Sequence, residues 1–181
     1  MRVIAGSARG VRLGPVPRGV RPVSDRAREG IFSSLGEAVA GARVLDLFAG
    51  TGAMAIEALS RGAERATLVE RDRAALRAIA DNLERTRLGV RATTQPGDVA
   101  RFVRERGGGD FDLLFLDPPY DLGPDELSSL LNEVLTSLAA PDATTVVTRR
   151  HGSSTLVIPV HWAIARRLRY GDTVALVLRR A

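Results

Sequence analysis

The sequence lacks several residue types, and each absence narrows the chemistry open to the protein. It has no cysteine, which excludes disulfides, thiolate metal sites and cysteine nucleophiles. It has only two histidines, His151 and His161, so we expect no histidine metal centre and no bound metal. No apolar run approaches the roughly 20 residues of a membrane span, and the first residues are polar and basic, unlike a signal peptide. These features predict a soluble, cytoplasmic protein.

Lysine is also absent, so all 26 basic residues are arginine, and their distribution along the chain is uneven. Residues 1–30 hold seven arginines against two acids, whereas the other 151 residues hold 19 of each sign. A basic segment of this kind indicates contact with nucleic acid phosphates, although a solvated basic tail is the alternative. The predicted phosphate-binding residues are Arg2, Arg9, Arg12, Arg18, Arg21, Arg26 and Arg28. For Arg26 and Arg28 the helix that holds them could face either the RNA or the mouth of the cofactor site.

The segment Asp117-Pro118-Pro119-Tyr120 is the strongest chemical signal in the chain. It follows the apolar run 113–116, which predicts a buried parallel strand, and open α/β sheets bind ligands at such strand ends. A carboxylate and a rigidly held Pro118 carbonyl can accept both N–H groups of a nucleobase amine, and Tyr120 offers a stacking face. We therefore predict methyl transfer to an exocyclic amine, with residues 117–120 catalytic. A strand followed by a plain turn is the alternative.

A second motif, residues 44–53, runs from an apolar strand through a glycine-rich turn into a helix. The glycines alone also fit a dinucleotide fingerprint. Asp46, inside the strand, would repel a pyrophosphate but attract a methionine ammonium, which favours S-adenosylmethionine. Glu70 ends the next strand and can accept ribose hydroxyls, which suits either cofactor. Asp98 can meet the adenine amine or simply cap a helix. The predicted cofactor residues are Asp46, Phe48, Ala49, Gly50, Thr51, Gly52, Glu70, Arg71, Asp98, Val99 and Asp117.

The periodicity of the chain predicts a doubly wound α/β fold. A helix over 25–35, with Ser24 as its N-cap, precedes the alternating part. Strands are expected near 43–47, 66–70, 91–95, 112–116 and 144–148, with helices near 53–61, 72–87, 98–106 and 124–139. Residues 162–170 and 173–178 then predict a hairpin that closes a mostly parallel seven-stranded sheet, as in Class I S-adenosylmethionine-dependent methyltransferases.

Ahead of this sheet we expect a short basic extension made of a β-hairpin and a helix. The hairpin would pair residues 2–5 with residues 11–13. Because two strands alone are marginal in water, it should lean on the main domain or become ordered on its partner. We predict a division into this extension, residues 1–36, and a methyltransferase domain, residues 37–181.

Several segments together resemble the RsmD family. They are residues 1–13, the segment 21–32 with its Arg-Pro-Val-Ser-Asp-Arg stretch, the turn 46–52, residues 57–63, residues 117–120 and residues 169–173. The resemblance implies methyl transfer from S-adenosylmethionine to N2 of a guanine in 16S rRNA, within an assembled or partly assembled small ribosomal subunit that can include ribosomal proteins. The sequence departs from the family at Thr148-Arg149-Arg150, where a glutamate is common.

Three other functions stay open at this stage. A DNA adenine-N6 methyltransferase uses the same four-residue pocket, but usually needs a target-recognition segment for which this chain has little room. A protein-glutamine methyltransferase usually has Asn where Asp117 stands and needs no basic arm. A non-catalytic RNA-binding assembly factor on the same fold would not need an intact glycine turn. The measurement that separates this last alternative from the enzymes is a titration with S-adenosylmethionine.

Overall fold

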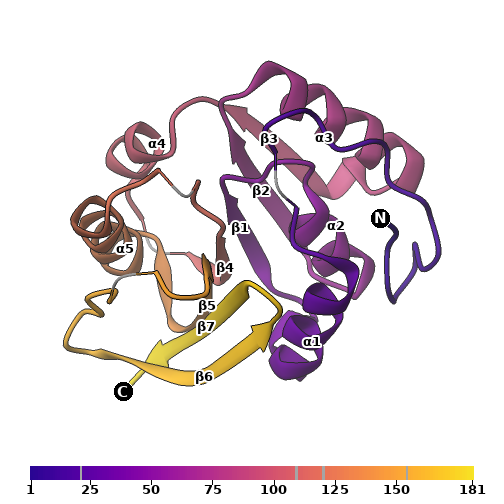
Figure 1. Cartoon of the computed structure of the whole chain (residues 1–181). Helices are drawn as coiled ribbons and strands as arrows, with labels where there is room; N and C mark the ends of the chain where they lie inside the picture. The colour runs from indigo at the N-terminus through magenta and orange to yellow at the C-terminus, as the bar shows by residue number, and fades with distance from the viewer. Residues whose placement is uncertain (21, 109, 120, 154) are drawn as a thin grey trace.

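A computed structural model describes residues 1–20, 22–108, 110–119, 121–153 and 155–181, and its centre is a seven-stranded sheet (Figure 1). The strands are β1 (Arg43–Leu47), β2 (Arg65–Glu70), β3 (Ala92–Pro96), β4 (Phe111–Leu116), β5 (Ala139–Arg150), β6 (Trp162–Tyr170) and β7 (Thr173–Arg180). Their order is β3-β2-β1-β4-β5-β7-β6. The first five are parallel, and β7 is antiparallel to both β5 and β6. The predicted fold class is confirmed.

Within the described residues, five α-helices cover the two faces of this sheet (Figure 1). They are α1 (Asp25–Leu35), α2 (Ala53–Ser60), α3 (Arg73–Thr86), α4 (Val99–Arg106) and α5 (Pro124–Ser137), with short 3-10 turns η1 (Gly36–Val39) and η2 (Gly89–Arg91). Helices α1, α2 and α3 share one core with alternate strand residues such as Val44 and Leu113, while α4 and α5 share the other core with Leu45 and Leu114. Burial on both faces explains why the parallel strands are continuously apolar. None of the described helices is long and apolar enough to cross a membrane.

Local signals in the sequence set most of these boundaries. Ser24, Asp72 and Asp98 each accept a hydrogen bond from a backbone N–H in the first turn of α1, α3 and α4, as N-caps do. Strand β5 is longer than the predicted 144–148, since Ala139 already pairs with Phe111 across a register shift. This early start of β5 also ends α5 at Ser137, two residues before the predicted end.

The N-terminal extension pairs as the predicted hairpin does, but over too short a stretch to form regular strands. An antiparallel bridge joins Arg2 to Arg12, and the N–H groups of Val3 and Leu13 donate to the carbonyls of Val11 (3.0 Å) and Met1 (3.1 Å). The Glu57 carboxylate accepts hydrogen bonds from the backbone N–H groups of Ile4 (2.8 Å) and Ala5 (3.0 Å). The side chains of Val3, Ala8 and Leu13 are buried in the same core as α1 and α2. Residues 1–36 therefore share a hydrophobic core with the sheet, and dividing the chain at residue 36 stays a prediction.

Candidate active site

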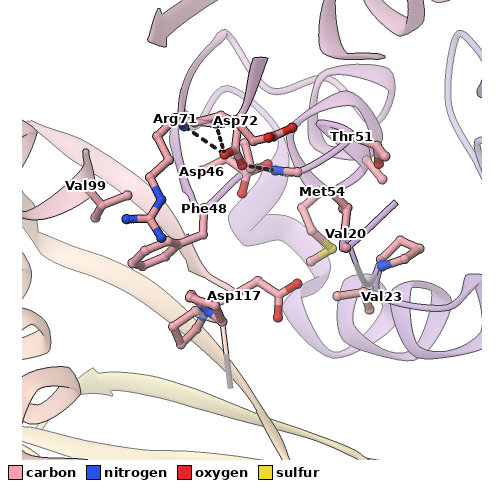
Figure 2. Close-up of a pocket in the computed structure, with 18 of the residues that line it drawn as sticks. Val20, Val23, Asp46, Phe48, Thr51, Met54, Arg71, Asp72, Val99 and Asp117 are labelled. Atoms are coloured by element: carbon pink, nitrogen blue, oxygen red, sulfur yellow. Dashed lines mark hydrogen bonds between the residues drawn. The ribbon is translucent and has the colours of Figure 1, made fainter. Parts of the chain in front are cut away.

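A cavity of about 420 Å³ opens at the carboxyl ends of the central strands and brings the predicted site residues together (Figure 2). Its lining comprises Arg18, Gly19, Val20, Pro22, Val23, Asp46, Phe48, Ala49, Gly50, Thr51, Ala53, Met54, Glu70, Arg71, Asp72, Gly97, Asp98, Val99, Asp117, Pro118 and Pro119. Gly52 is the one predicted cofactor residue that does not line the cavity. Tyr120 and Arg21, also predicted as site residues, lie outside the described residues.

The turn between β1 and α2 forms the floor of the cavity through an unusual backbone path. Phe48, Gly50 and Gly52 all have positive φ, at 62°, 57° and 75°. Glycine adopts this region without strain, whereas Phe48 is held there by its surroundings, a feature that often marks functional sites. A Cβ atom on Gly52 would lie 3.0 Å from the Leu68 side chain. Gly52 thus packs the turn against the sheet, and its predicted contact with the cofactor stays a prediction.

Glu70, at the end of β2, holds this turn against the loop that follows β2. One carboxylate oxygen accepts the Gly50 N–H at 2.8 Å, and the other accepts the N–H groups of Arg71 (2.8 Å) and Asp72 (2.9 Å), drawn as dashed lines in Figure 2. An ionised carboxylate has about four acceptor sites. A ribose hydroxyl would therefore share an oxygen that already accepts a backbone hydrogen bond.

The cavity is rich in carboxylates, which indicates the charge of its ligand. Five acids line it (Asp46, Glu70, Asp72, Asp98 and Asp117) against the two cations Arg18 and Arg71. Asp46 is fully buried with one oxygen accepting the Ala55 N–H at 3.1 Å, and this burial, with smaller effects from Asp117 and Glu70, raises its pKa well above the usual value. Such a site attracts a cationic group and repels a pyrophosphate. Within the described ranges, no cluster of three or more acidic or histidine side chains could hold a metal ion.

Asp117 sits just beyond β4, where a neighbouring strand orients its carboxylate. It is partly exposed through the cavity, yet burial among protein atoms raises its pKa to about 6. The hydroxyl of Thr148, buried on β5, donates a hydrogen bond to this carboxylate and opposes that rise. The sequence marked Thr148 only as a departure from the family. The contact could have been predicted from the expected parallel pairing of β4 and β5, because the carboxyl ends of two paired parallel strands lie at the same edge of the sheet.

One wall of the cavity comes from the N-terminal segment, for which the sequence predicted phosphate-binding arginines and no named cofactor residue. Val20 and Val23 face the cavity across from Phe48 and Arg71 (Figure 2). A single side chain on α3, that of fully buried Asn82, ties this segment to the glycine turn. Its amide nitrogen donates to the Thr51 carbonyl at 3.0 Å, and its amide oxygen accepts the Gly14 N–H at 2.7 Å. The N-terminal extension and the glycine turn are thus joined through the hydrogen bonds of Asn82.

Asp98, at the start of α4, is both a cavity residue and the cap of that helix. Asp98 lines the cavity and also caps α4, accepting the Arg101 N–H at 3.0 Å, and its second oxygen lies 3.9 Å from an Arg71 guanidinium nitrogen. Asp98 therefore caps α4, which is one of the two roles that the sequence left open for it. Val99, the first residue of α4, is buried beside it on the cavity wall.

The predicted phosphate-binding arginines divide into exposed and buried ones. The exposed set is Arg2, Arg9, Arg12, Arg18 and Arg26. Arg28 is fully buried, donates to the Arg2 carbonyl and to Asp25 (3.0 Å), and lies 3.9 Å from Glu57. Its burial lowers its pKa. The expectation that Arg28 contacts RNA is wrong, because its guanidinium is enclosed between α1, α2 and the N-terminal segment and cannot reach a phosphate.

Comparison with known proteins yields close relatives over the full chain. The family model described as "Conserved hypothetical protein 95" matches residues 1–179. "Ribosomal RNA small subunit methyltransferase D" of Escherichia coli (strain K12) is 35% identical over 173 residues, covering 92% of this chain and 83% of that protein. The structure of a "Putative methyltransferase yhhF from Escherichia coli" superimposes with a TM-score of 0.87 at 31% identity, covering 99% and 97% of the two chains. "A putative sam-dependent methyltransferase from Streptococcus mutans" (TM-score 0.70, 16% identity, 85% and 48% covered) shares the fold.

Proposed function

The chain belongs to the RsmD family and is an S-adenosylmethionine-dependent methyltransferase, and from this premise we propose that it methylates N2 of a guanine in small-subunit ribosomal RNA. The observation that carries the proposal is the position of Asp117. It lies in a carboxylate-rich cavity suited to a cationic cofactor, directly beside an extension with exposed arginines. The relative whose name specifies small-subunit ribosomal RNA covers 92% of this chain, which supports the same substrate class here.

The cavity residues fit S-adenosylmethionine, which supplies an electrophilic methyl group on a sulfonium. In the proposal, Asp46 attracts the methionine ammonium, directly or through water, while the turn 48–51 passes under the methionine part. Glu70 accepts from the ribose hydroxyls in addition to its backbone partners. The adenine lies between Phe48, Arg71 and the start of α4 at Asp98 and Val99, all of which line the cavity.

The target amine is held by Asp117 and the Pro118 carbonyl. A guanine N2 lone pair is delocalised into the ring and is a poor nucleophile, so accepting both of its N–H groups localises the lone pair and orients it toward the methyl group. Because the Asp117 pKa is about 6, this carboxylate is mostly ionised at neutral pH and can accept these bonds. Transfer is direct, without a covalent enzyme intermediate, and the proton leaves late, to Asp117 or water. Tyr120 stacks on the extruded base, a role that rests on the sequence alone.

The RNA follows the exposed arginines to this pocket. Arg2, Arg9, Arg12 and Arg26 provide salt-dependent phosphate contacts, and Arg18 stands on the cavity wall itself. We propose that the substrate is an assembled or partly assembled small subunit, so that ribosomal proteins can form part of the docking surface and the reaction takes place in the cytoplasm.

The test is transfer of tritiated methyl groups from S-adenosylmethionine to small ribosomal subunits that lack native methylation, beside naked 16S rRNA, duplex DNA and a protein pool. The expected product is N2-methylguanosine, identified by mass spectrometry and formed mainly from the subunits, with the Asp117→Ala variant as the inactive control that still binds cofactor. Label in DNA adenine or in protein glutamine would contradict the proposed substrate. No label in any substrate together with no cofactor binding would instead support the assembly-factor alternative, whereas no label despite cofactor binding would point to a missing assembly partner or intermediate.

A further inference from the structure

The net charge is carried by two separate segments of the chain, and only one of them is at the N-terminus. Residues 139–181 contain seven arginines and two acids, as unbalanced as residues 1–36 with the same numbers. The intervening residues 37–138 contain twelve arginines and seventeen acids. This acidic middle hides the second basic segment when charges are summed along the sequence. In the fold, the second basic segment is mostly the β6–β7 hairpin at the end of the sheet.

The arginines of β6 are exposed and unneutralised. Arg166, Arg167 and Arg169 are all solvent-exposed, and among the described residues no carboxylate lies within ion-pair distance of any of them. Some arginines of the acidic middle segment are neutralised by a neighbouring carboxylate. Arg43 pairs with Asp112 at 2.9 Å, and Arg101 pairs with Glu105 at 2.7 Å. The positive charges of these three β6 arginines are therefore not neutralised by any described carboxylate.

The surface these residues form, the β6 edge, borders the N-terminal basic segment on one of its two faces. Helix α1 contacts β6, and the two lie side by side in Figure 1. The contact is tight, since a Cβ atom on Gly30 of α1 would fall 1.7 Å from the Tyr170 hydroxyl. Arg166 pairs with Val177, whose side chain belongs to the core on the α1 side, so Arg166 projects to the face that carries α1. Arg167 and Arg169 pair with Leu176 and Val174, which belong to the other core, so these two arginines project to the opposite face of the same edge strand.

The β6 edge also ends close to the catalytic pocket. Tyr170 pairs with Thr173, which in turn pairs with Arg150, two residues beyond the Thr148 that contacts Asp117. The carboxyl end of β6 thus lies at the same end of the sheet as the cavity. An RNA whose target base occupies that cavity would pass between the N-terminal arginines on one side and β6 on the other.

We propose that the β6 edge, defined by Arg166, Arg167 and Arg169, is a second phosphate-binding surface for the RNA substrate; this inference rests on the proposed function. Arginine suits the task because its guanidinium donates two parallel hydrogen bonds to a phosphate. A competing explanation is that charges on an edge strand only prevent sheets from pairing between molecules. Charge of either sign serves that purpose, whereas only positive charge binds phosphate, and this difference makes the two explanations separable.

The test compares the double variant R166E/R167E with R73E/R77E as a matched control. Arg73 and Arg77 are exposed on α3, outside the described ion pairs, and lie toward the opposite edge of the sheet. Arg169 is left intact because its guanidinium donates to the Gly171 carbonyl at 3.4 Å in the turn. Binding of unmethylated small subunits is measured between 50 and 200 mM salt, with cofactor affinity measured in parallel.

We expect R166E/R167E to bind subunits roughly tenfold or more weakly, with the slope of log K against log salt reduced by about 1.4 to 1.8, corresponding to two lost contacts. Cofactor affinity should be unchanged, and the control should bind subunits within about twofold of the unmodified protein. Normal subunit binding by R166E/R167E, with the unmodified protein active on rRNA, would overturn this inference and leave the proposed function standing.

Two further outcomes of the test would overturn the inference. If the unmodified protein methylates no rRNA, the proposed function fails, and the RNA surface fails with it. If R166E/R167E loses cofactor affinity along with subunit binding, the charges act through folding, and the inference is overturned unless R166Q/R167Q shows the selective loss of subunit binding.

Discussion

At the residue scale, two carboxylates of the cavity, Asp46 and Asp117, differ in the groups that oppose the effect of burial on their pKa values. Burial raises the pKa of both, and among the described residues a side-chain hydroxyl, that of Thr148, favours the ionised form of Asp117 alone. Asp46 is held instead by a backbone N–H from α2. A cationic cofactor beside Asp46 would favour ionisation there, so cofactor binding and the charge of the site are linked.

Replacing Asp117 with Asn separates activity from stability. The native pKa of about 6 exceeds the unfolded value of about 3.9, so the folded state binds more protons between these values and loses stability as pH rises through that window. Above pH 6 the buried Asp117 carboxylate lowers the free energy of unfolding by its full amount. Asn cannot ionise, so the variant does not have this loss of stability. We expect turnover to fall by at least about 100-fold. The free energy of unfolding of the Asn variant should exceed that of the unmodified protein by about 1 to 2 kcal/mol at pH 8 and differ little from it near pH 4. Equal stability of the two proteins at pH 8 would contradict the burial argument.

Thr148 controls the pH at which Asp117 can work. Its hydrogen bond lowers the Asp117 pKa, so Thr148→Val should raise that pKa and move the acid limb of kcat/KM to higher pH than in the unmodified protein. Thr148→Ser keeps a hydroxyl and should restore the original profile. A Val variant that merely lowered kcat at every pH would show that Thr148 acts by packing instead.

At the scale of elements, α1 carries two arginines with opposite roles. Arg26 is exposed, while Arg28, two residues later, is buried against Asp25 and Glu57. The helix period places residues two apart on different faces. A sequence count treats both as cations near RNA, but their burial makes one a surface contact and the other part of the core.

The two arginines can be separated by alanine substitution. Arg28→Ala leaves the buried Glu57 without one cation and the Arg2 carbonyl without its donor, and should cost about 3 kcal/mol of unfolding free energy. Arg26→Ala should leave stability within about 0.5 kcal/mol and weaken subunit binding. Thermal or urea unfolding checks the first, and a subunit titration checks the second. A stable Arg28→Ala protein with weakened RNA binding would restore the original assignment of Arg28.

At the scale of the whole molecule, the N-terminal segment is both part of the core and a wall of the cofactor cavity. Val3 and Leu13 are buried with α1 and α2, while Val20 lines the cavity next to Gly50. Asn82 joins this segment to the glycine turn. Binding at the cavity should therefore be felt by the segment that presents RNA-binding arginines, which couples the two ligands.

Hydrogen exchange measures this coupling. With S-adenosylmethionine at about 100 times its Kd, which stabilises the folded state by about 2.7 kcal/mol, the amides of Gly19 and Val20 should exchange more slowly. The amides of Ala163 and Ile164, at the far end of β6 from the cavity, serve as the internal control and should change much less. Equal protection of both regions would mean that the cofactor stabilises the protein globally, without a specific link to the N-terminal segment.

Short-range patterns were enough to predict much of this protein. Ser24, Asp72 and Asp98 cap their helices, apolar runs form the buried strands, and glycines with positive φ form the turn after β1. The resemblance to the RsmD family was likewise readable from short motifs. These properties depend on backbone sterics and on side chains a few residues apart, so the sequence by itself determined them.

Only the tertiary structure decided what depends on residues far apart in the chain. Thr148 meets Asp117 because β4 and β5 are paired, and Val20 walls the cavity because the N-terminal segment folds back over the turn. Arg28 is buried because α2 supplies Glu57, 29 residues away, and β6 is exposed because it is the last strand of the sheet. Burial, pKa and charge neutralisation arise from neighbours in space, and no local pattern states which neighbours those are.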